Sequence, residues 1–400
     1  MSHGLGECDI REGFVEQLVF RTHHGDRTYV ELAQAATLAA LDGAGMGPED
    51  IEAVVFSMAP TEFMGVNDAD KWAVDSIFGA GKPFMRIHTG GATGGSAFHA
   101  AYAHIASGAY KSVLVVGADR VAETPDAQHV LNLIWDRFYE HDFALNTVTM
   151  TALAAQRYMQ RYGTTEEQFA RVVVRARKNA LKNPNAHLKG DISVDDVMQS
   201  PRIAWPFKRN DICPRSSGAA ALVLTDAGTA GRYCSRPAFV RSISAITHSV
   251  FMGDRVGPRS DTEFADQDGL DRAGLECYRR AGITDPRSEI DLVEFYDPFS
   301  SFQFAQLESL GFCERGQAQD ISDAGGLECG AGGLVSVNPS GGTLCTNPIG
   351  VTGLVRVIEA ARQVMGRADE MQVAGVHNAL ATAVGGSTQF FTCTVLGDDY

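Results

Sequence analysis

The chain has 400 residues, 44% of them hydrophobic, which is enough for two packed cores and excludes a disordered chain or a mini-scaffold. Its 34 Lys and Arg against 49 Asp and Glu give a net charge of −15, so the average surface would repel a nucleic-acid backbone or an anionic membrane. No apolar run approaches the ~20 residues of a membrane span, and the first residues lack the layout of a signal peptide. We therefore expect a cytoplasmic protein that binds neither nucleic acid nor membrane.

In chain order, the first half predicts alternating helices and strands. Apolar spacing indicates a helix over residues 28–43, and the apolar run at 51–56 indicates a strand. A glycine-rich turn at 89–95 then opens a second helix, and buried strands are predicted over 112–117 and 218–224.

Residues between about 119 and 212 have no counterpart in the second half of the chain. This segment is rich in polar and aromatic residues and carries a basic stretch at 171–182. Loops beside a fixed scaffold commonly select substrates, so we interpret the segment as an inserted lid. The alternative is a dimer contact or a solvated insertion.

The second half repeats the order of the first about 240 residues later. Helices are predicted over 270–280 and 355–364, and strands over 290–295, 372–376 and 389–396. We interpret the match as an internal duplication, with an amino half over residues 1–235 and a carboxyl half over 236–400. Because the strands are almost continuously apolar, an α/β fold with helices on both sheet faces is expected.

The eight cysteines are scattered along the chain. They form no CxxC pair and no tight Cys/His spacing, so we expect reduced thiols and no metal site.

Four separated motifs follow one another along the two halves. They are Gly-Ala-Thr-Gly at 91–94, Glu-Phe-Tyr-Asp-Pro-Phe at 294–299, Asn-Pro-Ile-Gly at 347–350, and His-Asn at 377–378 followed by Gly-Gly at 385–386. In this order they resemble the thiolase superfamily, in its branch related to sterol-carrier-protein-X thiolase. The resemblance implies the thiolase fold, with two duplicated halves packed in five layers and an inserted lid. It also implies a homodimer and a CoA thioester as substrate, with no further cofactor.

Gly91 stands where the family has its nucleophilic Cys, at the amino end of a helix. In a thiolase the helix N-terminus favours the thiolate of that Cys, which attacks the acyl thioester. No acyl-enzyme can form on a glycine, and Thr93 is expected to cap the helix instead. The sequence therefore disfavours thiolysis or Claisen condensation by the family's usual route.

Tyr296 holds the place of the polar residue that faces the reacting centre in the family's second motif, with Asp297 beside it. A phenol can donate a hydrogen bond to an oxyanion, or act as a general acid or base when its pKa is lowered from ~10. We predict that Tyr296 is catalytic and that Asp297 binds substrate. The alternative is a buried Tyr whose hydroxyl is satisfied by the backbone.

Asn347 replaces the His of the third motif. It keeps a donor for a thioester oxygen but cannot move a proton near neutral pH, and the alternative is that it only closes the turn. His377 is predicted to exchange a proton at the thioester α-carbon, although an isolated His at a strand end is more often a core residue. Backbone amides around Gly91 and Gly386 are predicted to bind the thioester oxygen, and His88 is a further candidate for the substrate site.

A thioester pocket without a nucleophile can still break a carbon–carbon bond by retro-aldol cleavage. In a β-hydroxyacyl-CoA a base takes the hydroxyl proton, the Cα–Cβ bond breaks, and hydrogen-bond donors hold the thioester enolate. The replacements resemble those of the steroid side-chain aldolases, which release propionyl-CoA and a 17-keto steroid. That resemblance implies a bulky apolar substrate and a small partner subunit with an OB fold and a zinc ribbon. These aldolases tend to carry a second Tyr where this chain has Leu-Cys-Thr-Asn at 344–347.

Two alternatives stay open. One is a thiolase-class acetyl-CoA acyltransferase with a displaced nucleophile, for which Cys345 is the candidate, although Cys213 and Cys345 are otherwise predicted to be packing thiols. The other is a non-catalytic acyl-CoA-binding subunit that stabilises a partner.

Overall fold

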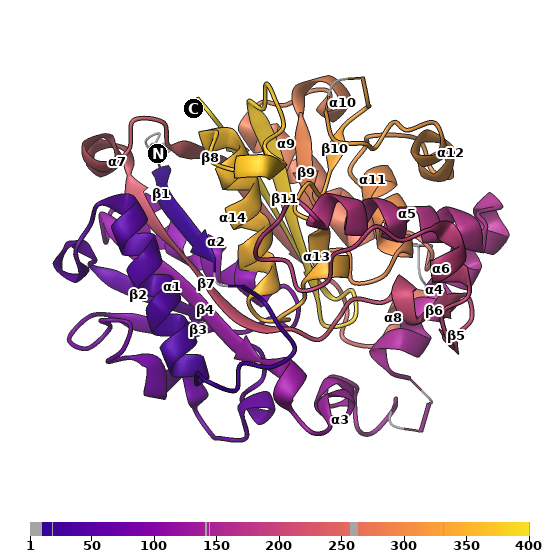
Figure 1. Ribbon diagram of the computed structural model, residues 1–400, viewed down its shortest axis with the longest axis horizontal. Helices are drawn as coiled ribbons and strands as arrows, with labels where there is room; N and C mark the ends of the chain where they lie inside the picture. The colour runs from indigo at the N-terminus through magenta and orange to yellow at the C-terminus, as the bar shows by residue number, and fades with distance from the viewer. Residues whose placement is uncertain are drawn as a thin grey trace, which may run out of the picture.

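The computed structural model describes residues 10–17, 19–140, 142–143, 145–256, 263–330 and 332–399. Ten of its strands form one continuous sheet that is built from two similar five-stranded halves (Figure 1). The amino half has the order β3-β2-β4-β7-β1, from β1 (Ile10–Gln17), β2 (Ala53–Ser57), β3 (Phe84–Ile87), β4 (Ser112–Arg120) and β7 (Ser217–Asp226). Strand β2 runs parallel to β3 and β4, whereas β7 runs antiparallel to β4 and β1.

The carboxyl half repeats this arrangement. Its order is β10-β9-β11-β12-β8, from β8 (Ala238–Thr247), β9 (Leu292–Glu294), β10 (Ser336–Val337), β11 (Asn378–Gly385) and β12 (Phe390–Gly397). Strand β9 runs parallel to β10 and β11, and β12 runs antiparallel to β11 and β8. The same mixed pattern in both halves confirms the predicted duplicated α/β architecture, and a short β1–β8 pairing joins the two.

Two central helices lie between the half-sheets. Helices α2 (Thr93–Ala106) and α14 (Thr352–Met365) pack on each other so closely that a Cβ on Gly94 would overlap the Leu354 nitrogen. Helix α1 (Tyr29–Ala44) covers the outer face of the amino half, and α9 (Asp268–Ala281) that of the carboxyl half. The result is five layers, helix–sheet–helix–sheet–helix, with cores on both sides of each half-sheet.

The predicted lid segment folds into α3 (Ala127–Asn132), α4 (Thr147–Tyr162), α5 (Glu166–Ala180), α6 (Val194–Met198) and a hairpin of β5 (Arg202–Ala204) and β6 (Phe207–Lys208). Helices α4 and α5 pack against the carboxyl half, beside α11 (Ser301–Ser309), α12 (Ala318–Asp323) and α13 (Gly342–Cys345) (Figure 1). Arg171 pairs with Asp323 at 2.5 Å, and the Tyr158 hydroxyl donates to Glu308 at 2.5 Å. The lid segment is therefore part of the amino half in sequence, but these contacts attach it to the carboxyl half.

The remaining short helices connect these elements. They are α7 (Ala227–Tyr233), α8 (Met252–Val256) and α10 (Pro286–Glu289). The predicted boundary between residues 235 and 236 falls in the loop between α7 and β8. None of the helices in the described ranges is both long and apolar enough to cross a membrane.

The prediction of a strand over residues 372–376 is wrong. This stretch is a loop in which the Gln363 side chain accepts a hydrogen bond from the Val373 N–H at 2.8 Å, and Val373 and Val376 fill the core beside α14. The strand that occupies this place in the duplication is β11, which begins at Asn378. Apolar residues alone did not distinguish a buried loop from a buried strand.

Candidate functional site

A turn of small residues at 89–92 leads into α2. Thr93 is the first residue of the helix, and its hydroxyl donates to the Gly90 carbonyl oxygen at 2.6 Å and accepts from the Thr89 N–H at 2.8 Å. The hydroxyl therefore fastens the turn to the helix, which differs from the predicted cap on a helical N–H group. The turn presents no side chain larger than a methyl group between Thr89 and Thr93.

Tyr296 occupies the space in front of Gly91. A Cβ on Gly91 would overlap the Tyr296 hydroxyl oxygen and would lie 2.5 Å from the Val384 carbonyl oxygen. Any side chain at position 91, including a nucleophilic Cys, is therefore excluded while Tyr296 stays in place. The phenol of the carboxyl half fills the position that the resemblance assigns to the nucleophile of the amino half.

The backbone of Tyr296 is fixed from two sides. Its N–H donates to the Thr382 hydroxyl of β11 at 3.1 Å, and its carbonyl accepts from the Gln306 amide of α11 at 2.7 Å. Thr382 in turn donates to Gln306 at 2.7 Å, so the three residues form a closed set of hydrogen bonds. Tyr296 is 5% exposed, and this support holds its hydroxyl at the glycine turn.

The electrostatic surroundings keep Tyr296 protonated. Burial raises the pKa of its phenol above the ordinary value of 10.0, and the nearby Cys213 and Asp119 raise this pKa further. Asp119, at the end of β4, is itself fully buried, and this burial raises its pKa well above the ordinary value although the Ala59 N–H donates to it at 2.9 Å. The site therefore holds a neutral phenol near neutral pH.

Asn347 lies in the turn before α14. Its side-chain oxygen accepts from the Ile349 N–H at 3.2 Å and from the Thr352 hydroxyl at 2.8 Å, which closes the turn. Its side-chain nitrogen donates to the Cys213 sulfur at 3.0 Å, and its own N–H donates to the Ser216 hydroxyl at 3.0 Å. The side-chain oxygen of Asn347 thus stabilises the turn, and its side-chain nitrogen faces Cys213.

The end of β11 meets the glycine turn. A Cβ on Gly385 would overlap the Thr89 carbonyl oxygen, and one on Gly90 would lie 2.7 Å from the Gly386 nitrogen. Such contact is open only to glycine. The structure therefore brings together Gly91, Tyr296 and Gly386.

Asp297 joins two loops and does not face the glycine turn. It is fully buried, with its carboxylate accepting from the Thr343 N–H at 2.7 Å and from the Gln303 amide at 2.7 Å. Burial raises its pKa to about 6 in spite of these donors. The predicted substrate contact is corrected accordingly: both carboxylate oxygens already bind protein groups.

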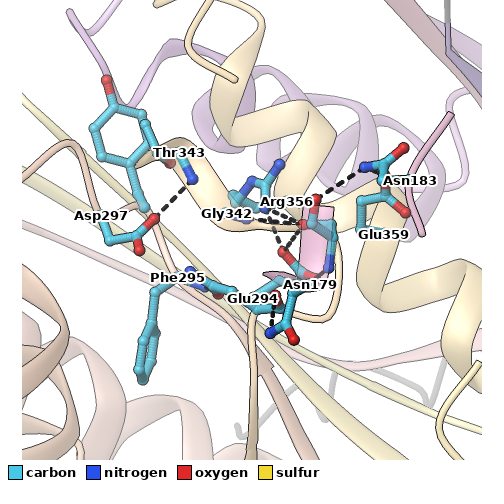
Figure 2. A network of polar contacts seen from close by, with 12 residues as sticks. Asn179, Asn183, Glu294, Phe295, Asp297, Gly342, Thr343, Arg356 and Glu359 are labelled. Carbon is cyan, nitrogen blue, oxygen red and sulfur yellow. Dashed lines mark hydrogen bonds and ion pairs between the residues drawn. The ribbon is translucent and has the colours of Figure 1, made fainter. Parts of the chain in front are cut away.

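A buried polar network continues from Asp297 beneath the site (Figure 2). Arg356 of α14 pairs with Glu294 at the end of β9, and both are at most 1% exposed. The Ser340 hydroxyl contacts both charged groups, at 2.7 Å in each case. Burial raises the pKa of Glu294 to about 7. The network holds the loops that carry Asn347 and Tyr296 against α14.

The structure contradicts the predicted role of His377. This residue precedes the first residue of β11, whereas Gly385 and Gly386 lie at the far end of that strand, about 25 Å away at ~3.3 Å per residue. The His377 side chain is 68% exposed and pairs with Asp398 at 2.7 Å, which raises its pKa. The two halves of the fourth motif belong to opposite ends of one strand, and only the Gly-Gly end reaches the site.

His88 follows β3 and directly precedes the glycine turn, on the exposed surface of the chain. Partial loss of water around its ring, together with Arg86, lowers its pKa, so the ring is neutral near neutral pH. It stays a candidate at the rim of the site.

One residue of the site was missed from the sequence: Asp119 contributes to the electrostatics around Tyr296. Cys213, which was predicted to be a packing thiol, contacts Asn347. The sequence did contain an indication of Asp119, because it is a charged residue at the end of a continuously apolar strand. An aspartate is seldom buried in a core unless it is paired or has a function. Among the described residues, no cluster of His, Cys, Asp or Glu could hold a metal ion.

Comparison with known proteins agrees with this geometry. The family model "Thiolase, N-terminal domain" matches residues 15–200, and "Thiolase C-terminal domain-like" matches residues 258–398. A steroid side-chain-cleaving aldolase from Thermomonospora curvata is 31% identical over 370 residues, covering 89% of this chain and 90% of that protein. The chain belongs to the thiolase family.

This thiolase-family chain is also similar to proteins with different reactions. An acetyl-CoA acetyltransferase from Methanothermobacter thermautotrophicus is 29% identical over 364 residues, covering 90% of this chain and 92% of that one. The solved structure of the Ltp2-ChsH2(DUF35) aldolase superposes with a TM-score of 0.82 at 26% identity and 97% coverage of both chains. The thiolase fold is confirmed.

Proposed function

We propose that this protein is a carbon–carbon lyase of the thiolase family that cleaves a β-hydroxyacyl-CoA into a ketone and a shorter acyl-CoA without an acyl-enzyme. The observation that carries the proposal is the contact between Tyr296 and Gly91: the volume of the nucleophile is filled by a phenol. An acyl-enzyme route needs a nucleophile at that point, whereas retro-aldol cleavage needs a proton-transfer group there.

The raised pKa of Tyr296 defines how the proton moves. As the Cα–Cβ bond breaks, the β-hydroxyl becomes the ketone and gives its proton to the phenol oxygen. The phenol passes its own proton to the α-carbon, which leaves as part of the acyl-CoA. Because Tyr296 is neutral before and after the step, no phenolate has to form in the buried site.

The negative charge that develops on the thioester oxygen needs hydrogen-bond donors. The backbone N–H groups of Gly91 and Gly386 are suited to this, because both stand where two side-chain-free segments meet. The Asn347 side-chain nitrogen is a third donor, once it exchanges its contact with Cys213 for the substrate.

The cysteines near the site favour this reading over a displaced nucleophile. Cys345 is fully buried, and burial raises its pKa to about 12. Burial also raises the pKa of Cys213 to about 12. Neither thiol is a thiolate near neutral pH, which a nucleophilic cysteine requires.

For the substrate we propose a bulky apolar acyl group of the steroid side-chain class, which yields propionyl-CoA and a ketone. The likeness to the steroid side-chain-cleaving aldolase supports this class.

We further propose a homodimer that binds a small DUF35-type subunit with an OB fold and a zinc ribbon, in analogy with the Ltp2-ChsH2(DUF35) complex. The lid carries large exposed apolar side chains, Phe138 at 90% and Phe143 at 64% exposure, of the kind that another protein covers. If this surface receives the DUF35 subunit, Phe138→Ser with Phe143→Ser abolishes co-purification and leaves the homodimer intact in sedimentation. Loss of the homodimer instead would assign the surface to self-association.

The reaction is tested by mass spectrometry of the chain with its DUF35-type partner and a β-hydroxyacyl-CoA that carries a bulky tertiary alcohol. We expect a ketone and propionyl-CoA with unmodified protein, and a loss of at least about 100-fold in rate for Tyr296→Phe. Tyr29→Phe is the matched control, because its hydroxyl bonds the Ala69 carbonyl far from the site. A thioester adduct on a cysteine would establish an acyltransferase, and tight acyl-CoA binding without products would establish a binding subunit.

A further inference from the structure

The segment that leads from the lid back into the sheet, residues 211–216, contacts two loops of the site at once. Cys213 donates its backbone N–H to the Pro298 carbonyl at 2.9 Å, in the loop after β9. Ser216 donates its N–H to the Asn347 carbonyl at 3.1 Å, and its hydroxyl accepts from the Asn347 N–H at 3.0 Å. The position of Cys213 relative to Asn347 is therefore fixed by hydrogen bonds on both sides.

The side-chain amide of Asn347 is held in one orientation. Its oxygen accepts from the Ile349 N–H and from the Thr352 hydroxyl, and these two donors fix the oxygen in the turn before α14. Its nitrogen consequently faces the opposite way, where the Cys213 sulfur lies at 3.0 Å. Because Asn347 is only 7% exposed, this nitrogen depends on groups in the site for its acceptors.

The Cys213 sulfur is a weak partner for this nitrogen. An amide nitrogen carries two N–H groups, and no residue that the structure describes offers it a second acceptor besides the sulfur. Sulfur accepts hydrogen bonds more weakly than a hydroxyl or carbonyl oxygen does. Burial raises the pKa of the Cys213 thiol to about 12, so near neutral pH the group is a neutral thiol and not a stronger, charged acceptor. The Asn347 nitrogen is thus fixed in place with little of its hydrogen-bonding capacity used.

The same thiol belongs to the surroundings of the phenol. Cys213 is close enough to Tyr296 to raise the pKa of its hydroxyl, and that hydroxyl fills the space in front of Gly91. Cys213 therefore lies near both of the side chains, Tyr296 and Asn347, to which we assign the reaction.

We propose that Cys213 is a positioning residue that keeps the Asn347 side-chain nitrogen available to the thioester oxygen of the substrate. In the free protein the sulfur contacts this nitrogen and reduces the penalty for burying it. When the thioester binds, its carbonyl oxygen is the stronger acceptor and takes the N–H group. A hydroxyl in place of the thiol would compete with that oxygen. This inference rests on the proposed function for the role of Asn347, and its test does not depend on turnover.

The test compares two CoA derivatives that differ in one group. Propionyl-CoA has the thioester carbonyl, whereas S-propyl-CoA has a methylene in its place, so only propionyl-CoA can accept from Asn347. Neither compound has a β-hydroxyl, so neither can be cleaved. Isothermal titration with the full chain and its DUF35-type partner gives the ratio of the two dissociation constants. A substitution that only disturbs the fold weakens the binding of both compounds alike and leaves this ratio unchanged.

For the wild type we expect propionyl-CoA to bind at least about five times more tightly than S-propyl-CoA. Cys213→Ser should lower this preference about fivefold, because a hydroxyl holds the Asn347 nitrogen more strongly than a thiol does. Cys213→Ala should keep or increase the preference, since no side-chain acceptor then competes. Cys313→Ser is the matched control: Cys313 is also a partly buried thiol, but it lies near Glu308 and Glu314, so the preference should stay.

The same ratio in the wild type and in both Cys213 variants would overturn the inference, and so would a higher ratio for Cys213→Ser than for Cys213→Ala. If the ratio follows the expected order while the β-hydroxyacyl-CoA is not cleaved, the lyase is overturned and the role of Cys213 stands. If cleavage occurs and the ratio does not respond to position 213, the role of Cys213 is refuted and the lyase stands.

Discussion

The two turns that open the central helices occupy equivalent places in the duplicated halves, yet they are built in opposite ways. The turn before α2, at residues 89–92, is defined by missing side chains, since Gly90 and Gly91 lie against Gly386 and Tyr296. The turn before α14, at residues 347–351, is defined by hydrogen bonds that the Asn347 side-chain oxygen accepts from Ile349 and Thr352, and by one that the Asn347 backbone N–H donates to the Ser216 hydroxyl. Close backbone packing therefore distinguishes the first turn, which the Thr93 hydroxyl also fastens, whereas hydrogen bonds to Asn347 maintain the second.

This difference explains why the glycine at position 91 leaves no void. The Tyr296 side chain of the carboxyl half fills the volume in which the resemblance places the nucleophile of the amino half. Substitutions in the first turn should therefore destabilise the fold by steric overlap. Substitutions in or beneath the second turn should destabilise it by loss of hydrogen bonds or ion pairs. The following four changes test that distinction through the free energy of unfolding in denaturant.

The largest effect is expected beneath the second turn. Arg356→Leu leaves the buried Glu294 without its partner, and it should lower the free energy of unfolding by about 3–5 kcal/mol. Arg279→Leu, a control at a 70% exposed side chain on α9, should leave stability within error. If both variants behave alike, the network is not what supports this turn.

In the first turn, Gly91→Ala should lower the free energy of unfolding by about 3 kcal/mol, because its Cβ overlaps the Tyr296 hydroxyl. The loss should shrink in the background of Tyr296→Ala, which removes the overlap with the phenol and leaves only the close approach to the Val384 carbonyl oxygen. Gly253→Ala is the control, since nothing lies within 4 Å of its added Cβ. Additive effects of the two substitutions would refute the steric exclusion between these residues.

The free energy of unfolding should depend on pH through Asp297, which belongs to the buried polar network beneath the second turn. Because the pKa of Asp297 is about 6 in the folded chain against an ordinary 3.8, the folded state holds this proton more tightly than the unfolded state. Its contribution to stability is complete below pH 3.8 and is lost as the pH rises through about 6, a change on the order of 3 kcal/mol. Asp297→Asn should flatten the stability curve in this window, and an unchanged slope would contradict the assignment.

The smallest effect concerns a single hydrogen bond. Thr352→Val removes the donor to the Asn347 side chain and should lower the free energy of unfolding by about 1 kcal/mol. Thr37→Val provides the contrast, because the Thr37 hydroxyl is buried without a partner among the described residues and its loss should not destabilise. Equal losses in both variants would mean that the hydrogen bond contributes nothing to the second turn.

The sequence was sufficient for the elements whose signal is local. The helix predicted over 28–43 is α1, opened by Thr28 with Glu31 in a capping box. The strand predicted over 51–56 is β2, which begins two residues later and ends one residue later. The resemblance to the thiolase superfamily also implied that Gly91 and Tyr296 belong to one site. The helix and strand signals depend on periodicity, which a single sequence contains, whereas the site depended on the resemblance.

The predictions that were wrong or missing concern the boundaries of β11 and contacts between residues far apart in the sequence. The apolar residues at 373 and 376 were assigned to a strand, although β11 begins only at Asn378. His377 was assigned to the site because His-Asn at 377–378 resembles a family motif, and the sequence did not show that β11 separates this end from Gly385. Asp119 was missed because its proximity to Tyr296 arises from packing between residues more than a hundred positions apart in the chain. The overlap of Tyr296 with a Cβ at position 91 is likewise a property of the packed structure alone.

The attachment of the lid to the distant half has a consequence for how the chain is made. The hydrogen-bond partners of Arg171 and Arg175 on α5 are Asp323 and Ser322, which are synthesised 152 and 147 residues later. At ~5–20 residues per second, a ribosome needs roughly 8–30 s to supply these partners. During this interval the side of α5 that packs on the carboxyl half, with Phe169, Val172 and Ala176, stays uncovered, whereas its other side can already pack on α6. The nascent chain therefore depends on completion, or on a chaperone, in a way that two independently folding domains would not.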